Sequence, residues 1–238
     1  MKLTWLGQAG YFIVTEQNLR IMIDPYLSNN LEMVKGESFH REVPMKEEAF
    51  QLEPDVLILT HIHDDHTDFA TLDRILSESK KPMSVLAPLN TWQEVRRRYG
   101  GIHEYIQFDE GIEVTLEGVR FCSMYAAHSD ERAVGVLIQA DCKQIYHTGD
   151  TLFHRRLGEY IEGKVDAMLL PINGKGNNMN IADALRLTRK IKPLKVFPMH
   201  WDMFKAYGCD PMPFEIELKK SLQDTEVILP EEYCEIEL

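Results

Sequence analysis

The chain has 238 residues, of which 44% are hydrophobic and 27% are charged, and its formal net charge at pH 7 is −12. A negative charge of this size repels polyphosphate backbones, which argues against a nucleic-acid substrate. The longest apolar runs are far too short to span a membrane, so we expect no membrane segment.

The start of the chain and its cysteines bear on where the protein works. Residues 1–7 enter a strand pattern directly, without the apolar block of a signal peptide. The four cysteines are scattered with no Cys-x-x-Cys pair, so neither a zinc ribbon nor disulfides are expected. No linker-like stretch divides the chain. We therefore expect a cytoplasmic protein with a single domain over residues 1–238.

Three short strands open the predicted order of elements. Apolar runs at residues 2–6, 11–14 and 19–23 are separated by turn residues, and an antiparallel meander is their simplest arrangement. The third run ends in Asp24. The long polar segment 26–54 has no sustained periodicity, and both a lid or binding loop and a mobile connection fit that pattern.

Strands and helices alternate in the next part of the chain. A strand at 55–59 precedes helical spacing over 69–79, a strand at 84–87 and a helix over 90–99. Arg96 to Arg98 are the best candidate for a local basic patch. Their place near the end of a helix also fits cations that face the negative end of the helix dipole, and we favour that interpretation.

The second half of the chain repeats this change of pattern. Strand patterns dominate residues 105–146, and alternation then returns with a helix at 152–161, a strand at 166–170, a helix at 181–191 and a strand at 195–198. Two sheets packed face to face with helices outside them account for this order. The sequence predicts an α/β fold of the αββα sandwich type, with polar ligands on loops at one edge.

One motif, at the end of the strand at 55–59, carries most of the chemistry. His61-x-His63-x-Asp65-His66 places four potential metal ligands within six residues. His61 and His63 are two apart, and a strand's period of two sends such side chains to one face, where both imidazoles can reach one ion. Asp65 and His66 fall in the following turn and are placed for a second ion.

Three further candidate ligands, His128, Asp150 and His200, each follow an apolar run. Asp150 has an alternative role as the cap of a helix from Leu152, but Gly149 permits the tight turn that would aim its carboxylate at a pocket. We expect surface, packing or other structural roles for the remaining histidines: His40, His103, His147 and His154.

In order and spacing these residues resemble the ligand set of the metallo-β-lactamase fold of hydrolases, over nearly the whole chain. The resemblance implies two mixed sheets in the αββα sandwich and two divalent ions. It implies that Asp24 is a carboxylate that orients a ligand imidazole. It assigns one ion to His61, His63 and His128, the other to Asp65, His66 and His200, and Asp150 to both.

Three stretches, residues 5–10, 146–153 and 182–202, look like the L-ascorbate-6-phosphate lactonase branch of this superfamily. That likeness implies a small anionic substrate and a homo-oligomer, and it favours manganese. Imidazoles and carboxylates without thiolates suit zinc, manganese or iron. Two ions would share a hydroxide that opens a lactone or ester, and either Asp65 or a metal-bound water is our candidate proton carrier.

An anionic substrate also requires positive charge near the ions. Residues 173–178 precede the helix that starts near Asn180, and glycine-rich amides beside Lys175 would form an anion cradle with Asn177 and Asn178. A plain glycine turn capped by Asn180 explains the same residues equally well.

Two other functions are compatible with the same ligand set. A phosphodiesterase acting on a lipid or nucleic acid would use the same ions, but the acidic charge disfavours nucleic acid. A metal-binding sensor without turnover would be expected to lack some ligands, and this chain has all of them. We therefore expect a metal-dependent hydrolase acting on a carboxylic ester or lactone.

Overall fold

A computed structural model describes all 238 residues, which form two seven-stranded sheets. The first sheet contains β14 (Glu235–Glu237), β1 (Lys2–Gly7), β2 (Gly10–Val14), β3 (Arg20–Ile23), β4 (Val56–Ile58), β5 (Ser84–Ala87) and β6 (Glu104–Gln107), in that spatial order. The second contains β13 (Glu226–Val227), β12 (Lys195–Met199), β11 (Ala167–Pro171), β10 (Lys143–His147), β9 (Val134–Ala140), β8 (Val119–Tyr125) and β7 (Glu113–Leu116).

Both sheets are mixed, and both change direction at the same place in their order. In the first, neighbours from β14 to β3 are antiparallel and those from β3 to β6 are parallel. In the second, β7 to β10 are antiparallel and β10 to β13 are parallel. The predicted meander of the first three strands is confirmed.

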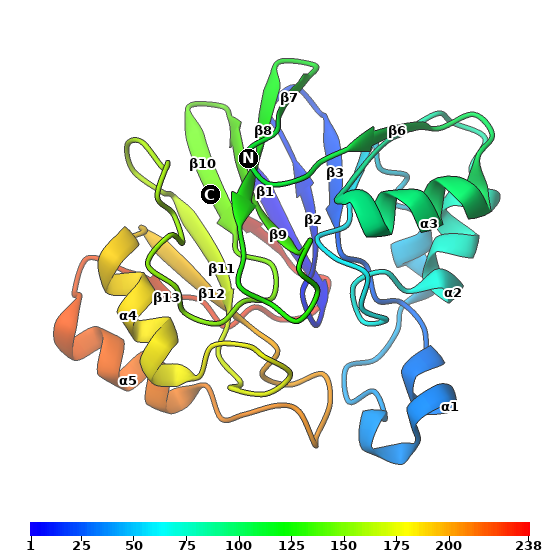
Figure 1. The fold of residues 1–238 in the computed structure, drawn as a ribbon. Helices are drawn as coiled ribbons and strands as arrows, with labels where there is room; N and C mark the ends of the chain where they lie inside the picture. The colour runs from blue at the N-terminus through cyan, green and yellow to red at the C-terminus, as the bar shows by residue number, and fades with distance from the viewer.

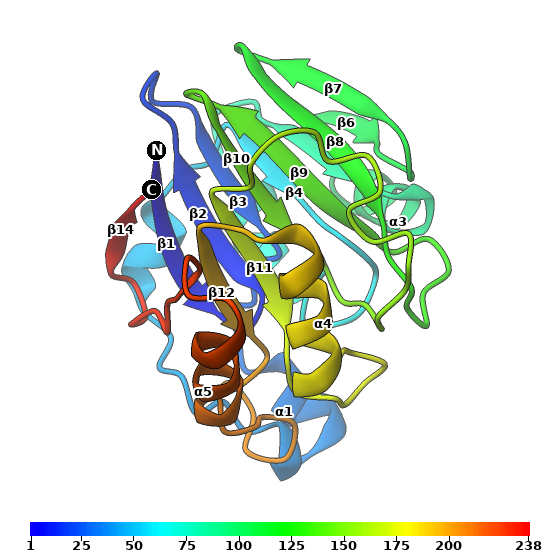
Figure 2. The same ribbon diagram turned by 90° about the vertical axis from the view of Figure 1, so that its left-hand side faces the viewer.

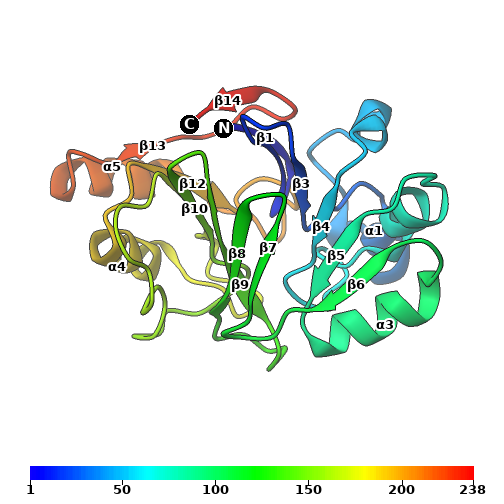
Figure 3. The ribbon, with the colours of Figure 1, turned by 90° about the horizontal axis from the view of Figure 1, so that it is seen from above.

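Four of the five α-helices lie on the outer faces of the two sheets, which gives four layers (Figures 1 and 3). The first sheet is covered by α2 (Phe69–Leu72), which continues into a π-helical turn to Ser77, and by α3 (Leu89–Tyr99). The second is covered by α4 (Ile181–Ile191) and α5 (Met212–Ser221). No helix is both long enough and apolar enough to cross a membrane. The predicted αββα sandwich is confirmed.

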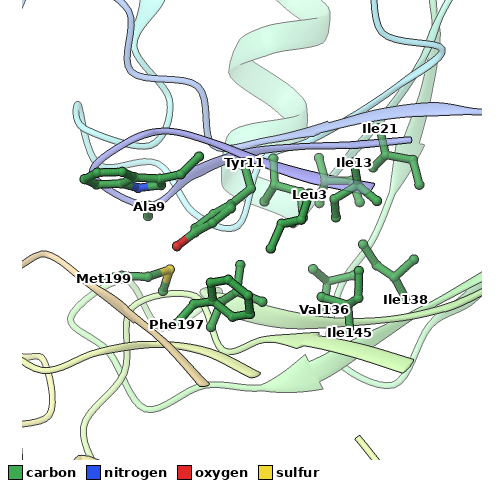
Figure 4. Close-up of a cluster of buried hydrophobic side chains, with 14 of the residues drawn as sticks. Leu3, Ala9, Tyr11, Ile13, Ile21, Val136, Ile138, Ile145, Phe197 and Met199 are labelled. Carbon is green, nitrogen blue, oxygen red and sulfur yellow. The ribbon is translucent and has the colours of Figure 1, made fainter. Parts of the chain in front are cut away.

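The largest core lies between the sheets and contains 27 buried residues. Figure 4 shows Leu3, Tyr11 and Ile13 of the first sheet pointing toward Ile145 and Phe197 of the second. Two smaller clusters fill the spaces beneath the outer helices. Burial on both faces explains why β4, β5 and β11 read as continuous apolar runs instead of alternating patterns.

The predicted helix over 152–161 is wrong, because this stretch forms turns. The amide of Leu152 donates to Ala127 O at 2.8 Å, outside any helix. Gly158 has φ +68°, and a Cβ there would lie 2.4 Å from the Cδ1 atom of Ile191. The close approach of α4 therefore fixes a left-handed residue where a helix would need a right-handed one.

The polar segment 26–54 is more ordered than its pattern suggests. It contains α1 (Asn30–Lys35) and two 3-10 turns, Glu37–Phe39 and Glu47–Gln51. Arg41 pins it to the rest of the molecule: the buried guanidinium donates to the Val43 carbonyl at 2.7 Å and the Tyr26 carbonyl at 2.5 Å. The segment thus forms a fixed wall beside the end of the sandwich where the candidate ligands lie.

Candidate metal centre

The ends of five strands bring the predicted ligands to one edge of the sandwich. Asp24 follows β3, the His61 motif follows β4, and the other three candidates, His128, Asp150 and His200, follow β8, β10 and β12. These strands run parallel to one another within each sheet, so their carboxyl ends share an edge. Chain segments far apart in sequence are therefore placed together by topology alone.

The first donor group consists of three imidazoles. The Nδ1 atom of His63 lies 3.0 Å from Nε2 of His61 and 3.1 Å from Nε2 of His128. Three ring nitrogens this close cannot all form hydrogen bonds with one another, because each nitrogen of a neutral imidazole is either a donor or an acceptor. A cation that accepts three lone pairs resolves the arrangement.

The second donor group combines Asp65, His66 and His200. Nε2 of His66 lies 3.7 Å from Oδ2 of Asp65. Asp150 lies between the groups: its Oδ1 is 2.8 Å from His200 Nε2 and 3.3 Å from His66 Nε2, and its Oδ2 is 3.9 Å from His128 Nε2. One carboxylate therefore faces both groups.

Three buried atoms support a cation at the second group. His66 Nε2, His200 Nε2 and Asp150 Oδ1 have no hydrogen-bond partner, although Asp150 Oδ1 lies within 3.3 Å of both imidazole nitrogens. The ligand atoms of His66 and His200 lie within 4.8 Å of each other, so the three atoms can share one binding point. Buried polar atoms are normally paired, and a metal ion at that point would pair them. The donor set therefore fits a divalent cation.

Electrostatics hold His61 and Asp150 in the protonation states that a metal requires, and they favour a bound proton or another positive charge at His66. Burial lowers the pKa of His61 well below its ordinary value, which leaves a neutral imidazole. Burial alone would raise the pKa of Asp150, but His200 and His66 hold it well below the usual range. Burial likewise opposes charge on His66, yet Asp150, Asp65 and Asp24 raise its pKa well above normal. Carboxylates around this imidazole thus favour a positive charge at the site.

Asp24 fixes two of the imidazoles. Its Oδ2 accepts from His66 Nδ1 at 2.7 Å and from the Thr60 hydroxyl at 2.6 Å. The Thr60 oxygen lies 3.0 Å from Nδ1 of His61, and because its single proton goes to Asp24 it accepts from that ring. Both rings are left with a bare Nε2 that faces the donor groups, in the tautomer that a ligand needs.

The centre lines a cavity of about 220 Å³. Its lining combines His63, Asp65, Asp150 and His200 with residues of α1, of the turns after α1 and β12, and of the loop before α4. Phe39 stacks on Tyr207 with ring centroids 4.7 Å apart. Lys35 and Lys175 also line the cavity, and the Lys35 ammonium lies 2.8 Å from the Asp64 carboxylate.

The predicted anion-binding residues have partners within the protein. Lys175 Nζ donates to the Ala206 and Gly208 carbonyls at 2.9 and 3.2 Å, and the Asn177 carbonyl lies 3.2 Å from His128 Nδ1. Asn178 is buried and donates to Oδ2 of Asp150 at 2.9 Å, while its side-chain oxygen accepts from Thr151 N. Asn178 thus positions Asp150. The loop is a glycine turn before α4, which Asn180 caps.

The sequence analysis did not identify Gln8 as a site residue. Its side-chain nitrogen lies 2.8 Å from Asp65 Oδ2 and 2.9 Å from His200 Nδ1. The helix and strand patterns give no signal for it, because it sits at φ +53° in the turn between β1 and β2. Only its place within the stretch 5–10 set it apart in the sequence.

The remaining histidines lie outside the two groups. His147 is buried, with Nε2 3.0 Å from Ala9 O and Nδ1 accepting from Gly149 N at 3.1 Å. His103 lies 2.9 Å from the Leu76 carbonyl, and His40 lies 2.9 Å from Glu32. His154 packs against the Tyr125 ring.

The layers and the ligand-bearing edge define a metallo-hydrolase sandwich, and comparison with known proteins agrees. Residues 19–201 match the model of the beta-lactamase superfamily domain, and the chain belongs to this superfamily. A UPF0173 metal-dependent hydrolase of Pyrococcus abyssi is 28% identical over 224 residues, which cover 90% of this chain and 91% of that protein.

Two solved structures share the fold. Igni18, a metallo hydrolase of Ignicoccus hospitalis, has a TM-score of 0.77 and 25% identity, with 100% of this chain and 98% of that chain covered. The metallo-beta-lactamase fold protein YhfI of Bacillus subtilis has a TM-score of 0.74 and 17% identity, with 99% and 98% covered. Fold, donor groups and relatives together place the chain among the metal-dependent hydrolases of its superfamily.

Proposed function

We propose that this protein opens a small anionic lactone or ester by hydrolysis at a centre of two divalent ions, manganese or zinc. The observation that carries the proposal is the convergence of two donor groups on one shared carboxylate, Asp150, beside a cavity. One ion would be held by His61, His63 and His128, the other by Asp65, His66 and His200, with Asp150 common to both.

Two divalent cations in the two donor groups would supply a water nucleophile with a pKa of about 7 and would polarise a substrate carbonyl. The protein then has to orient the ester and move one proton. Water adds to the acyl carbon, the acyl carbon–oxygen bond breaks, and the departing alkoxide must be protonated. Asp65 lines the cavity and is our candidate to carry that proton from the water to the alkoxide.

The cavity argues for a small substrate. Its volume of about 220 Å³ lies below the ~300–1,000 Å³ of sites for drug-sized ligands. The stacked Phe39 and Tyr207 rings offer an apolar surface. The Lys175 ammonium makes two hydrogen bonds to carbonyls and retains a third donor, while Lys35, which also lines the cavity, is paired with Asp64. An anionic group beside a compact lactone ring or ester matches these walls.

The test is hydrolysis by protein reconstituted with manganese or with zinc. Substrates would be L-ascorbate 6-phosphate, an unphosphorylated lactone of similar size and a phosphodiester. We expect turnover of a lactone or ester and a loss of at least about 100-fold in kcat/KM for Asp65→Asn, since the substitution removes both a ligand and the proton carrier.

The matched control is Asp73→Asn, because Asp73 is an exposed partner of Arg98 that does not line the cavity. This variant should retain wild-type turnover. Protein that holds two ions but cleaves only the phosphodiester would contradict the ester assignment. Protein that binds no metal would contradict the centre itself.

A further inference from the structure

Four histidines direct Nε2 toward the two donor groups: His61, His66, His128 and His200. The hydrogen-bond partner of the other ring nitrogen, Nδ1, differs among them. Nδ1 of His66 donates to Asp24, Nδ1 of His61 donates to Thr60, and Nδ1 of His128 faces the Asn177 carbonyl. Each of these three nitrogens has an oxygen acceptor. That partner places the proton on Nδ1 and leaves Nε2 free to bind a cation.

His200 differs from the other three. The atom beside its Nδ1 is the side-chain nitrogen of Gln8, at 2.9 Å, and an amide nitrogen can only donate. Nδ1 of His200 must then accept, which puts the ring proton on Nε2, the atom that lies 2.8 Å from Asp150 Oδ1. In this arrangement His200 has no lone pair to offer an ion.

The orientation of the Gln8 amide is explained by Asp65. The same nitrogen lies 2.8 Å from Oδ2 of Asp65, an ionised carboxylate that requires a donor. If the amide turned over, its oxygen would face this carboxylate and repel it. One atom of Gln8 therefore cannot serve Asp65 as a donor and His200 as an acceptor at the same time.

We infer that Gln8 is the positioning residue of His200, and that its amide turns over when the second donor group takes up an ion. A metal ion at Nε2 of His200 requires the ring proton to move to Nδ1, and Nδ1 then needs a hydrogen-bond acceptor. The same ion draws negative charge from Asp65, so the Asp65 carboxylate then tolerates the Gln8 oxygen beside it. The inference rests on the proposed two-ion function and adds a side-chain rearrangement to it.

The surrounding turn holds Gln8 in place for this role. Its backbone oxygen accepts from the Trp5 indole at 3.2 Å, and the side chain is buried. A Cβ at Gly7 would lie 2.5 Å from Met203 Cε, and one at Gly10 would lie 3.1 Å from the Asp24 carbonyl. The hairpin is thus packed against the Asp24 loop and the segment after His200, and rotation of the amide is the simplest adjustment left.

The test is zinc titration by calorimetry on wild type, Gln8→Met and Gln8→Glu, with ¹⁵N NMR of the histidine rings. Methionine removes the hydrogen bonds, and we expect the affinity for the second ion to fall by about 10–100-fold while the first ion binds as in wild type. Glutamate offers oxygen only, so it should retain the second ion with at least wild-type affinity. In wild type the His200 proton should move from Nε2 to Nδ1 on loading.

The variants separate the possible failures. If Gln8 acted only as a donor to Asp65, glutamate would weaken the second ion at least as much as methionine, and the inference would be overturned. Equal two-ion binding by wild type and Gln8→Met would overturn it as well. Wild-type protein that takes up fewer than two ions would instead refute the proposed function. Gln107→Met, at an exposed position in β6, controls for loss of an amide elsewhere.

Discussion

Hydrogen-bond partners, more than residue types, decide which histidines can bind an ion. His61 and His147 are both fully buried and both follow or end a strand. The two nitrogens of His147 are occupied by Ala9 and by the Gly149 amide, whereas Nε2 of His61 faces only another imidazole nitrogen, Nδ1 of His63. The predicted ligands do lie next to one another, but the sequence pattern around Gln8 could not reveal its role. That role depends on contacts with Asp65 and His200, which are 57 and 192 positions away in the chain.

Lys175 gives a prediction at the residue scale. Lys175→Met should raise KM for a phosphorylated or carboxylated substrate by about 10-fold and leave kcat within about twofold, since a charge-assisted hydrogen bond of ~1.5 kcal/mol is lost from binding alone. Steady-state kinetics on a charged and an uncharged ester would measure it. Lys205→Met is the control, because Lys205 lies outside the cavity lining, on the loop whose Ala206 and Gly208 carbonyls accept from Lys175. Equal KM values for both esters in the variant would remove Lys175 from the binding site.

The elements that matter most for the centre are the turns at strand ends. Gly149 follows β10 with φ +61°, and a Cβ there would lie 2.5 Å from the Val134 carbonyl and 3.4 Å from Thr60 Cβ. Asp150 comes next in the chain. The turn therefore brings the shared carboxylate against the loop that follows β4, at a distance that no larger residue permits.

Gly149→Ala should destabilise the protein by about 2–4 kcal/mol, because it adds a clash with backbone to the cost of a left-handed conformation. Urea unfolding of the metal-free protein would measure the change. The matched control is Gly176→Ala, which has nearly the same φ of +64° but nothing within 4 Å of the added carbon, and it should cost about 1 kcal/mol. Similar losses in both variants would show that the contact with Val134 is unimportant.

The success of the sequence analysis varied with the length and burial of each element. Long periodic helices such as α3 and α4 and buried strands such as β5 and β11 were predicted within one or two residues. No element was predicted after residue 198, so α5 was missed although it has ten residues. The missed strands β13 and β14 have two and three residues, too few to show a period, and they are defined by pairing with β12 and β1.

At the scale of the molecule, the centre belongs to neither sheet alone. Asp24 and residues 61–66 come from the first sheet, and the other three candidates come from the second. Strand β14 closes the first sheet by pairing with β1, so the two ends of the chain lie side by side (Figure 2). Any ion held by both sets of residues would connect the two sheets.

Metal removal should therefore lower the stability of the whole molecule. A metal ion at a concentration of 100 times its Kd adds about 2.7 kcal/mol to the free energy of unfolding. For a chain of this length, that corresponds to an increase in Tm of about 5–10 °C. Calorimetry with manganese or zinc and with chelator would measure the shift. Asp150→Asn weakens both donor groups and should reduce it. An unchanged Tm in wild type at saturating metal would contradict a site that spans the sheets.

The positions of the ligands along the chain also set the order in which they leave the ribosome. The three imidazoles of the first group are complete once residue 128 has been made, whereas the second group waits for His200. A nascent chain thus carries one full set of donors for more than 70 residues of further synthesis. The second donor group therefore cannot form until β12 and the residue that follows it have been synthesised.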